Sequence, residues 1–137
     1  MTESATPQSP VPWSDFVKMT KEKGLPANEL FAVISTPTAG VGPVFANLDP
    51  HLAYQAKLQG DGVMFAAGPL SATDGSAWAG MGIFFYRADS LADAVALAEQ
   101  DPMHKSGART FEVRAWLLNE GTFSVRLSYS TGTFNLG

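Results

Sequence analysis

The chain has 137 residues, of which 45% are hydrophobic and 16% charged, with a net charge of −4 and no cysteine. This composition is typical of a globular protein that buries one core, and the acidic balance without a basic run disfavours nucleic-acid or anionic-membrane partners. The lack of cysteine excludes a disulfide framework, a thiolate nucleophile and a cysteine-ligated zinc site.

The N-terminal segment, residues 1–29, is predicted to form a tail and a short helix. Residues 1–11 are rich in Ser, Thr and Pro, a composition that predicts a mobile tail. They lack the basic and apolar regions of a signal peptide. No stretch approaches the roughly 18 apolar residues that span a bilayer. We therefore expect a soluble, cytoplasmic protein. The short helix is predicted from Pro12 to Lys23, with Gly24 just past its end.

The main domain begins with a predicted strand, loop and helix. Residues 30–38 are apolar and partly β-branched, which predicts a strand. A flexible loop is expected over residues 39–48, because its AGVGP sequence lacks the context of a phosphate-binding loop. Asp49 and Pro50 then predict a helix to about Gln59, as its N-cap and its first helical residue.

Two further strands and a second helix follow. Residues 63–70 and 81–87 are predicted strands, each an apolar run bounded by turn residues. Ser90 followed by Asp93 resembles a capping box and predicts a helix. That helix should end before Pro102, because a residue that precedes proline avoids the helical region.

The last strand of the domain is predicted over Arg109–Leu118. Its residues alternate, with Phe111 and Val113 on one face and Glu112 and Arg114 on the other. Such an alternation is typical of a strand with one buried face.

This order of elements predicts an α+β fold of the ferredoxin-like βαββαβ type over residues 30–118. The C-terminal extension, residues 119–137, is predicted to form a β-hairpin. A sheet with helices on only one face leaves an apolar face exposed, which favours a homodimer or a higher homo-oligomer. A monomer whose hairpin folds over its own sheet is the alternative.

Two histidines and one aspartate are candidates for chemistry. His51 is predicted in the first turn of its helix, where the macrodipole opposes a cation and favours the neutral imidazole that a general base needs. A surface histidine at a helix start is the alternative. Asp101 is predicted at a helix C-terminus, where its charge needs a hydrogen-bonding or cationic partner; a turn-forming Asp-Pro is the alternative. His104 can reach the same space, or be a solvated loop residue.

Arg109 and Arg114 are candidate anion contacts, because guanidinium groups suit carboxylate recognition. Arg114 alternatively forms a cross-strand ion pair that involves Glu112. Two histidines and scattered acidic residues lack zinc-ligand spacing, so we expect no metal, and no motif calls for an organic cofactor. No serine lies in a nucleophile elbow.

Two segments carry a resemblance to a known family: PHLAYQAKLQGDGVMFAAGPLS and GMGIFFYRADSLADAVALAEQDPMHKSGARTFEVRAWL. They contain a helix-borne His, a strand that runs into Gly-Pro, a further strand, an S-x-x-D/E-A helix and a D-P-x-x-x-x-G loop. In this order the chain resembles the YCII (YciI-like) family over residues 30–118.

The resemblance implies a dimeric α+β barrel and a His-Asp dyad in a cleft, which falls on His51 and Asp101. The Gly-Pro motif falls on Gly68 and Pro69 beside the dyad. There Gly68 would let a substrate approach the backbone closely, unless the pair only ends a strand. The family is similar in fold to muconolactone isomerase, and some members are dehydrochlorinases of chlorinated hydroxyquinols.

The function we expect is that of a cofactor-independent lyase or isomerase acting on a small cyclic or aromatic-derived substrate. His51 would take a proton from a carbon next to a carbonyl, and Asp101 would orient the imidazole and stabilise its charged form. His104 and Arg114 are predicted further substrate contacts. Two alternatives stay open: a non-catalytic small-molecule binding or sensing module, and a structural role in which the hairpin drives assembly.

Overall fold

The structure, a computed structural model, describes residues 9–136. The chain divides into two compact units. One is formed by residues 29–117, and the other by the terminal segments before and after them. The mobile tail predicted for residues 1–11 falls outside the described residues except at its end.

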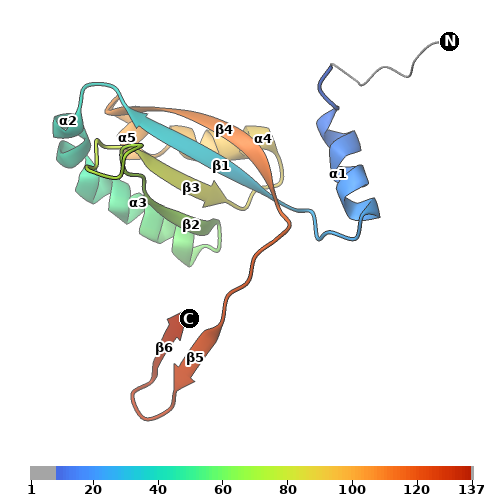
Figure 1. Cartoon of the computed structure of the whole chain (residues 1–137). Helices are drawn as coiled ribbons and strands as arrows, with labels where there is room; N and C mark the ends of the chain where they lie inside the picture. The colour runs from blue at the N-terminus through green and yellow to red at the C-terminus, as the bar shows by residue number, and fades with distance from the viewer. Residues whose placement is uncertain (1–8, 137) are drawn as a thin grey trace. The chain divides into compact units, whose positions relative to one another are not determined.

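Four strands form one sheet in the spatial order β2-β3-β1-β4 (Figure 1). Strand β3 runs antiparallel to both of its neighbours, with Phe84 opposite Val33 of β1 and Ile83 opposite Gly68 of β2. The strands are β1 Asn28–Pro37, β2 Met64–Pro69, β3 Gly82–Tyr86 and β4 Arg109–Leu118. All four lie where the alternating or apolar runs predicted them.

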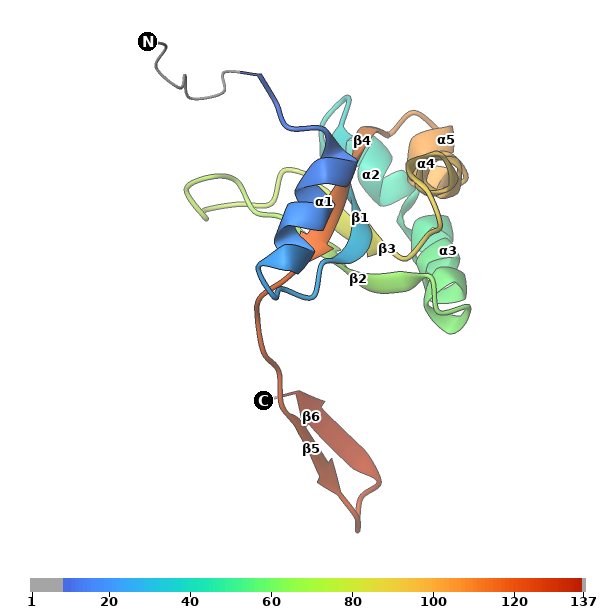
Figure 2. The same ribbon diagram turned by 90° about the vertical axis from the view of Figure 1, so that its right-hand side faces the viewer.

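The helices of this unit lie together on one face of the sheet (Figure 2). They are α2 Val41–Ala46, α3 Leu48–Gly60, α4 Leu91–Glu99 and α5 Pro102–Lys105. Between helices and sheet lies a core that includes Val33, Leu58, Phe84 and Ala98. An antiparallel sheet with helices on one face is consistent with the ferredoxin-like α+β fold that the element order predicts.

Helix α2 corrects the prediction of a flexible loop over residues 39–48. The prediction rested on the AGVGP sequence, which lacks the context of a phosphate-binding loop, and Gly42 and Pro43 are also poor helix formers. The segment is helical because Val44 is fully buried, in a cluster with Met103 and Ala108. Tertiary packing therefore outweighs local preference here.

The start of α3 also differs from the prediction, whereas the start of α4 does not. Asp49 is not an N-cap, because α2 and α3 meet at Asn47 and α3 begins one residue before Asp49. At α4, by contrast, Ser90 is the N-cap, and its Oγ accepts a hydrogen bond from the Asp93 N–H at 3.1 Å. Helix α4 ends at Glu99, before Pro102 as expected.

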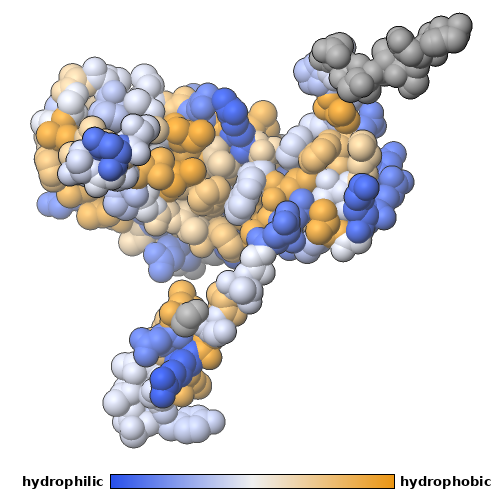
Figure 3. Space-filling model, viewed as in Figure 1, coloured by the Kyte–Doolittle hydropathy of each residue, from blue (hydrophilic) through white to orange (hydrophobic). Residues whose placement is uncertain are grey.

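The second unit contains helix α1, Trp13–Glu22, and a hairpin of β5, Val125–Ser128, and β6, Thr133–Leu136. The hairpin is antiparallel, with Leu127 opposite Phe134. Both side chains are exposed, and Figure 3 shows apolar surface on the hairpin. Across residues 9–136 no helix has the length and apolar character needed to cross a membrane.

Candidate functional site

His51 and Asp101 form a buried pair. The imidazole Nδ1 lies 2.8 Å from Oδ1 and 2.9 Å from Oδ2 of the carboxylate. His51 is 4% exposed and Asp101 0%, although one lies in the first turn of α3 and the other follows α4. The alternative of a surface histidine is therefore wrong.

The local structure at Asp101 differs from the prediction. We expected a helix C-terminus, but α4 has already ended and Asp101 is the N-cap of the next helix, α5, which begins at Pro102. Its Oδ1 accepts a hydrogen bond from the Met103 N–H at 2.9 Å. The reason is that proline suits the first position of a helix, so Pro102 starts a new turn instead of only ending the old one. The carboxylate is thus bound on one side by a backbone N–H and on the other by His51.

This geometry identifies the ring nitrogen of His51 that donates to Asp101. A carboxylate accepts hydrogen bonds and cannot donate them, so the proton between the two groups belongs to Nδ1. In the neutral imidazole the Nε2 atom then carries the lone pair, and within the described part of the chain no hydrogen bond to Nε2 is formed. The ring packs against Phe84, with 5.4 Å between centroids. It is held from two sides while its second nitrogen stays available.

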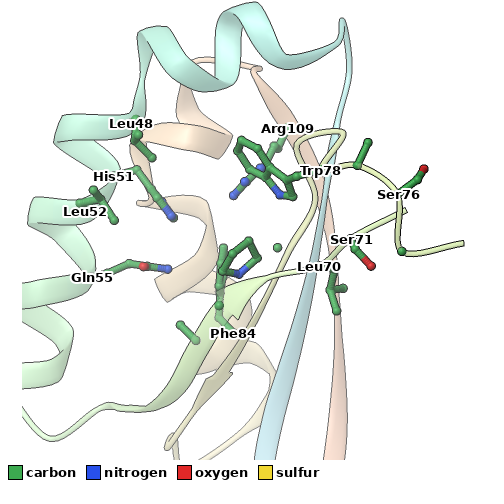
Figure 4. Close-up of a pocket in the computed structure, with 16 residues that line it drawn as sticks. Leu48, His51, Leu52, Gln55, Leu70, Ser71, Ser76, Trp78, Phe84 and Arg109 are labelled. Atoms are coloured by element: carbon green, nitrogen blue, oxygen red, sulfur yellow. The ribbon is translucent and has the colours of Figure 1, made fainter. Parts of the chain in front are cut away.

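The imidazole borders a cavity of about 740 Å³. Figure 4 shows His51 pointing from α3 into this space, opposite the segment that follows β2. Large apolar and aromatic side chains make up much of the wall: Leu48, Leu52, Leu70, Trp78 and Phe84. The indole of Trp78 is fixed because its N–H donates to the Met81 carbonyl at 2.8 Å.

Gly68 and Pro69, the end of β2, also border the cavity. A Cβ built at Gly68 would meet no atom within 4 Å, so no neighbouring side chain requires a glycine at this position. The backbone of β2 is consequently open to the cavity. The structure places the Gly-Pro motif on the wall, as the resemblance implied, and contact with a substrate stays a prediction.

Four further polar residues line the cavity: Ser71 and Ser76 of the segment after β2, Gln55 of α3 and Arg109 of β4. Arg109 is 4% exposed, and its Nε donates to the Gly80 carbonyl at 2.7 Å. Burial lowers the pKa of Arg109 from its ordinary value, and the negative charge of Asp101 acts in the opposite direction. Sequence reasoning missed Gln55, although it lies four residues after His51 and therefore on the same face of α3.

Comparison with known proteins identifies the family. The YCII-related domain family matches residues 30–117, which is more than half of the chain. The chain belongs to this family. The resemblance seen in the sequence is thereby confirmed. No curated protein matches the chain.

Among solved structures, the chain is similar to 5-chloro-2-hydroxyhydroquinone dehydrochlorinase from Burkholderia phenoliruptrix, in complex with 2,5-dihydroxybenzoquinone. The two are 22% identical, the match covers 64% of this chain and 92% of the other, and the TM-score is 0.48.

His104 of this YCII domain does not line the cavity. Its Nδ1 lies 2.7 Å from the Ala98 carbonyl, and its Nε2 lies 2.7 Å from the Ser35 hydroxyl. Because a carbonyl only accepts, the proton is on Nδ1 and the hydroxyl donates to Nε2. The interpretation as a solvated loop residue is wrong, and burial lowers the pKa of His104. Its predicted contact with substrate is untested.

Arg114 lies away from the cavity, on the exposed face of β4. It forms an ion pair at 3.4 Å with Glu112 of the same strand, so the pair does not cross between strands. No three His, Cys, Asp or Glu side chains within residues 9–136 come together as metal ligands. The polar residues that line the cavity of the YCII domain are His51, Gln55, Ser71, Ser76 and Arg109, and Asp101 lies behind His51.

Proposed function

We propose that the protein is a lyase or isomerase that acts without a cofactor on a small cyclic or aromatic-derived substrate, with His51 as general base. One observation carries the proposal: Asp101 holds the proton on Nδ1 of His51, and the opposite nitrogen is free at a cavity. This is the arrangement by which a carboxylate orients a catalytic imidazole.

The reaction begins when Nε2 of His51 takes a proton from a substrate carbon next to a carbonyl, and the electron pair moves to the carbonyl oxygen as an enolate. The imidazolium is stabilised by Asp101, which lies within 2.9 Å of Nδ1. In an isomerase the same proton returns to another carbon of the enolate. In a lyase the enolate instead expels a leaving group from the adjacent carbon. Both outcomes balance without an external oxidant or reductant.

The cavity supports a ring-shaped substrate. Its volume of about 740 Å³ lies within the range of small-molecule sites, which is about 300–1,000 Å³. Trp78 and Phe84 offer flat apolar surfaces, while few polar groups compete for the substrate. Small-molecule binding without chemistry would use the same walls, so the test has to follow a bond change and not binding alone.

The test is proton exchange into deuterated water. Enolisable ring ketones, unsaturated lactones and chlorinated hydroxyquinols are incubated with the protein, and exchange, rearrangement or halide release is followed by NMR. We expect turnover of at least one class, and a loss of about 10²–10⁴-fold in His51→Gln, which is the usual contribution of a positioned base. Circular dichroism of the variant verifies its fold. Unchanged turnover in folded His51→Gln refutes the proposal, and binding without any chemical change supports the binding-module alternative.

We also propose that a second copy of the chain covers the sheet face opposite the helices. Phe85 and Trp116 lie on this face, with ring centroids 4.7 Å apart and both side chains half-buried. Aromatic pairs of this kind are common at interfaces. Light scattering coupled to size-exclusion chromatography tests the proposal, because a dimer has twice the 14.5 kDa mass of the chain.

A further inference from the structure

Arg109 is a buried cation at the wall of the cavity. Its Nη1 has no hydrogen-bond partner among the described residues, although the side chain is 4% exposed. No ion pair joins its guanidinium to a carboxylate anywhere in residues 9–136. Asp101 is already engaged by His51 and by the Met103 N–H. A buried charge without a partner is strongly destabilising, so a counter-charge is expected where the guanidinium faces open space.

Gln55 provides a second unused donor at the same cavity. Its Nε2 is buried and has no partner in the described part of the chain. Figure 4 shows the amide of Gln55, the imidazole of His51 and the guanidinium of Arg109 directed from α3 and β4 toward the same space. Gly82 leaves room for the cation, because a Cβ at that position would lie 3.3 Å from Nη1 of Arg109.

We propose that Arg109 and Gln55 hold the ionised oxygen of a ring substrate, a carboxylate or phenolate, while His51 acts on a ring carbon. This inference rests on the proposed function and narrows its substrate class to small cyclic anions. Guanidinium–oxyanion hydrogen bonds are among the stronger ones in proteins, since both partners are charged. The rest of the wall is largely apolar, so a neutral ring would leave the cation unpaired and an anionic ring would not.

Of the two arginines on β4, only Arg109 is placed to bind a substrate anion in the cavity. Arg114 is on the exposed side of β4 and is paired with Glu112, whereas Arg109 is buried and its Nη1 is unpaired. The predicted anion contact therefore moves from Arg114 to Arg109.

Benzoate and benzamide test this subsite, because they share shape and differ in charge. Binding of each is measured by isothermal titration calorimetry. We expect the wild type to bind benzoate about tenfold or more tightly than benzamide, and Arg109→Met to lose about tenfold or more in benzoate affinity with little change for benzamide. Gln55→Met should weaken benzoate by severalfold. The matched controls Arg126→Met and Gln59→Met change exposed residues that do not line the cavity, and they should leave both affinities unchanged.

Three results overturn the inference: no benzoate binding by the wild type, equal affinity for the two probes, or unchanged benzoate affinity in folded Arg109→Met. If Arg109→Met does not fold, the benzoate preference of the wild type and its severalfold reduction in Gln55→Met decide. The proposed function is judged separately, by turnover in His51→Gln. That variant keeps Arg109 and should still bind benzoate, so either idea can fail while the other stands.

Discussion

Replacing Asp101 by Asn changes one atom and one charge at the centre of the site. The wild-type Oδ1 accepts from Nδ1 of His51 at 2.8 Å and from the Met103 N–H at 2.9 Å, and Oδ2 lies 2.9 Å from the same Nδ1. An Asn that keeps the Met103 bond places its NH₂ group where Oδ2 stands. Two N–H donors then face each other, and His51 relieves this by moving its proton to Nε2.

The consequence for catalysis is large and the consequence for folding small. With the proton on Nε2, His51 has no lone pair toward the cavity, so turnover should fall by about 10²–10⁴-fold. Asn is as good an N-cap as Asp, so α5 should keep its start. In Asp101→Ala the cap and both side-chain hydrogen bonds are lost, and the free energy of unfolding should fall by about 2–4 kcal/mol. Asp101→Asn thus tests the effect of the carboxylate charge on catalysis, and Asp101→Ala tests the contribution of the side chain to stability.

The assay combines three measurements. The ¹⁵N chemical shifts of the His51 ring report which nitrogen carries the proton, substrate turnover reports catalysis, and urea denaturation gives the free energy of unfolding. If His51 in Asp101→Asn keeps its proton on Nδ1 and turnover falls by less than about tenfold, the assigned tautomer is not what makes the base, and the reasoning fails.

Three further predictions follow from the same contacts. In Gly82→Ala the new Cβ would lie 3.1 Å from Cε1 of Phe84 and 3.3 Å from Nη1 of Arg109, so we expect severalfold weaker benzoate binding and a loss of about 1 kcal/mol in stability, tested by calorimetry and thermal unfolding; unchanged values would contradict this. The hydroxyl of Tyr86 is buried without a partner in the described structure, so Tyr86→Phe should leave the urea midpoint equal or higher, and a clear decrease would reveal a missed partner. Burial lowers the pKa of His104 from 6.5, so the unfolded chain takes up its proton first as the pH falls. Stability should accordingly be complete above pH 6.5 and decrease below it, less steeply in His104→Gln, and equal slopes in urea titrations would argue against a buried neutral imidazole.

The strands and the main helices could be predicted because their signals are local. Residues alternate over Arg109–Leu118, and the other strands are apolar runs. Both patterns arise because each strand turns one face toward the helices, where its side chains are buried. The Ser90 cap was likewise predictable, because its bond to the Asp93 N–H spans three residues. An interaction between residues that are close in the sequence can be predicted from that short segment alone.

The misassigned segments depend on contacts across the fold. Helix α2 exists because Val44 packs against Met103 and Ala108, more than fifty residues later in the chain. Asp101 became an N-cap because α4 ended early enough for Pro102 to start another turn. Neither packing partners nor the spacing between two helices can be read from the local sequence, so residues 39–48 were assigned to a loop and Asp101 to a helix end.

The arginine of the site was nevertheless decidable from the sequence. Residues of a strand alternate between faces, so Arg109 and Arg114, five positions apart, must point to opposite sides of the sheet. Arg109 has the parity of Phe111 and Val113, which pack on the core under the helices, and the helices carry His51. An arginine at either position could bind an anion. Only Arg109, which shares its face of β4 with the buried side chains, lies on the same side of the sheet as His51. Strand parity, applied to charged residues as strictly as to apolar ones, therefore selects Arg109 as the partner of a substrate anion.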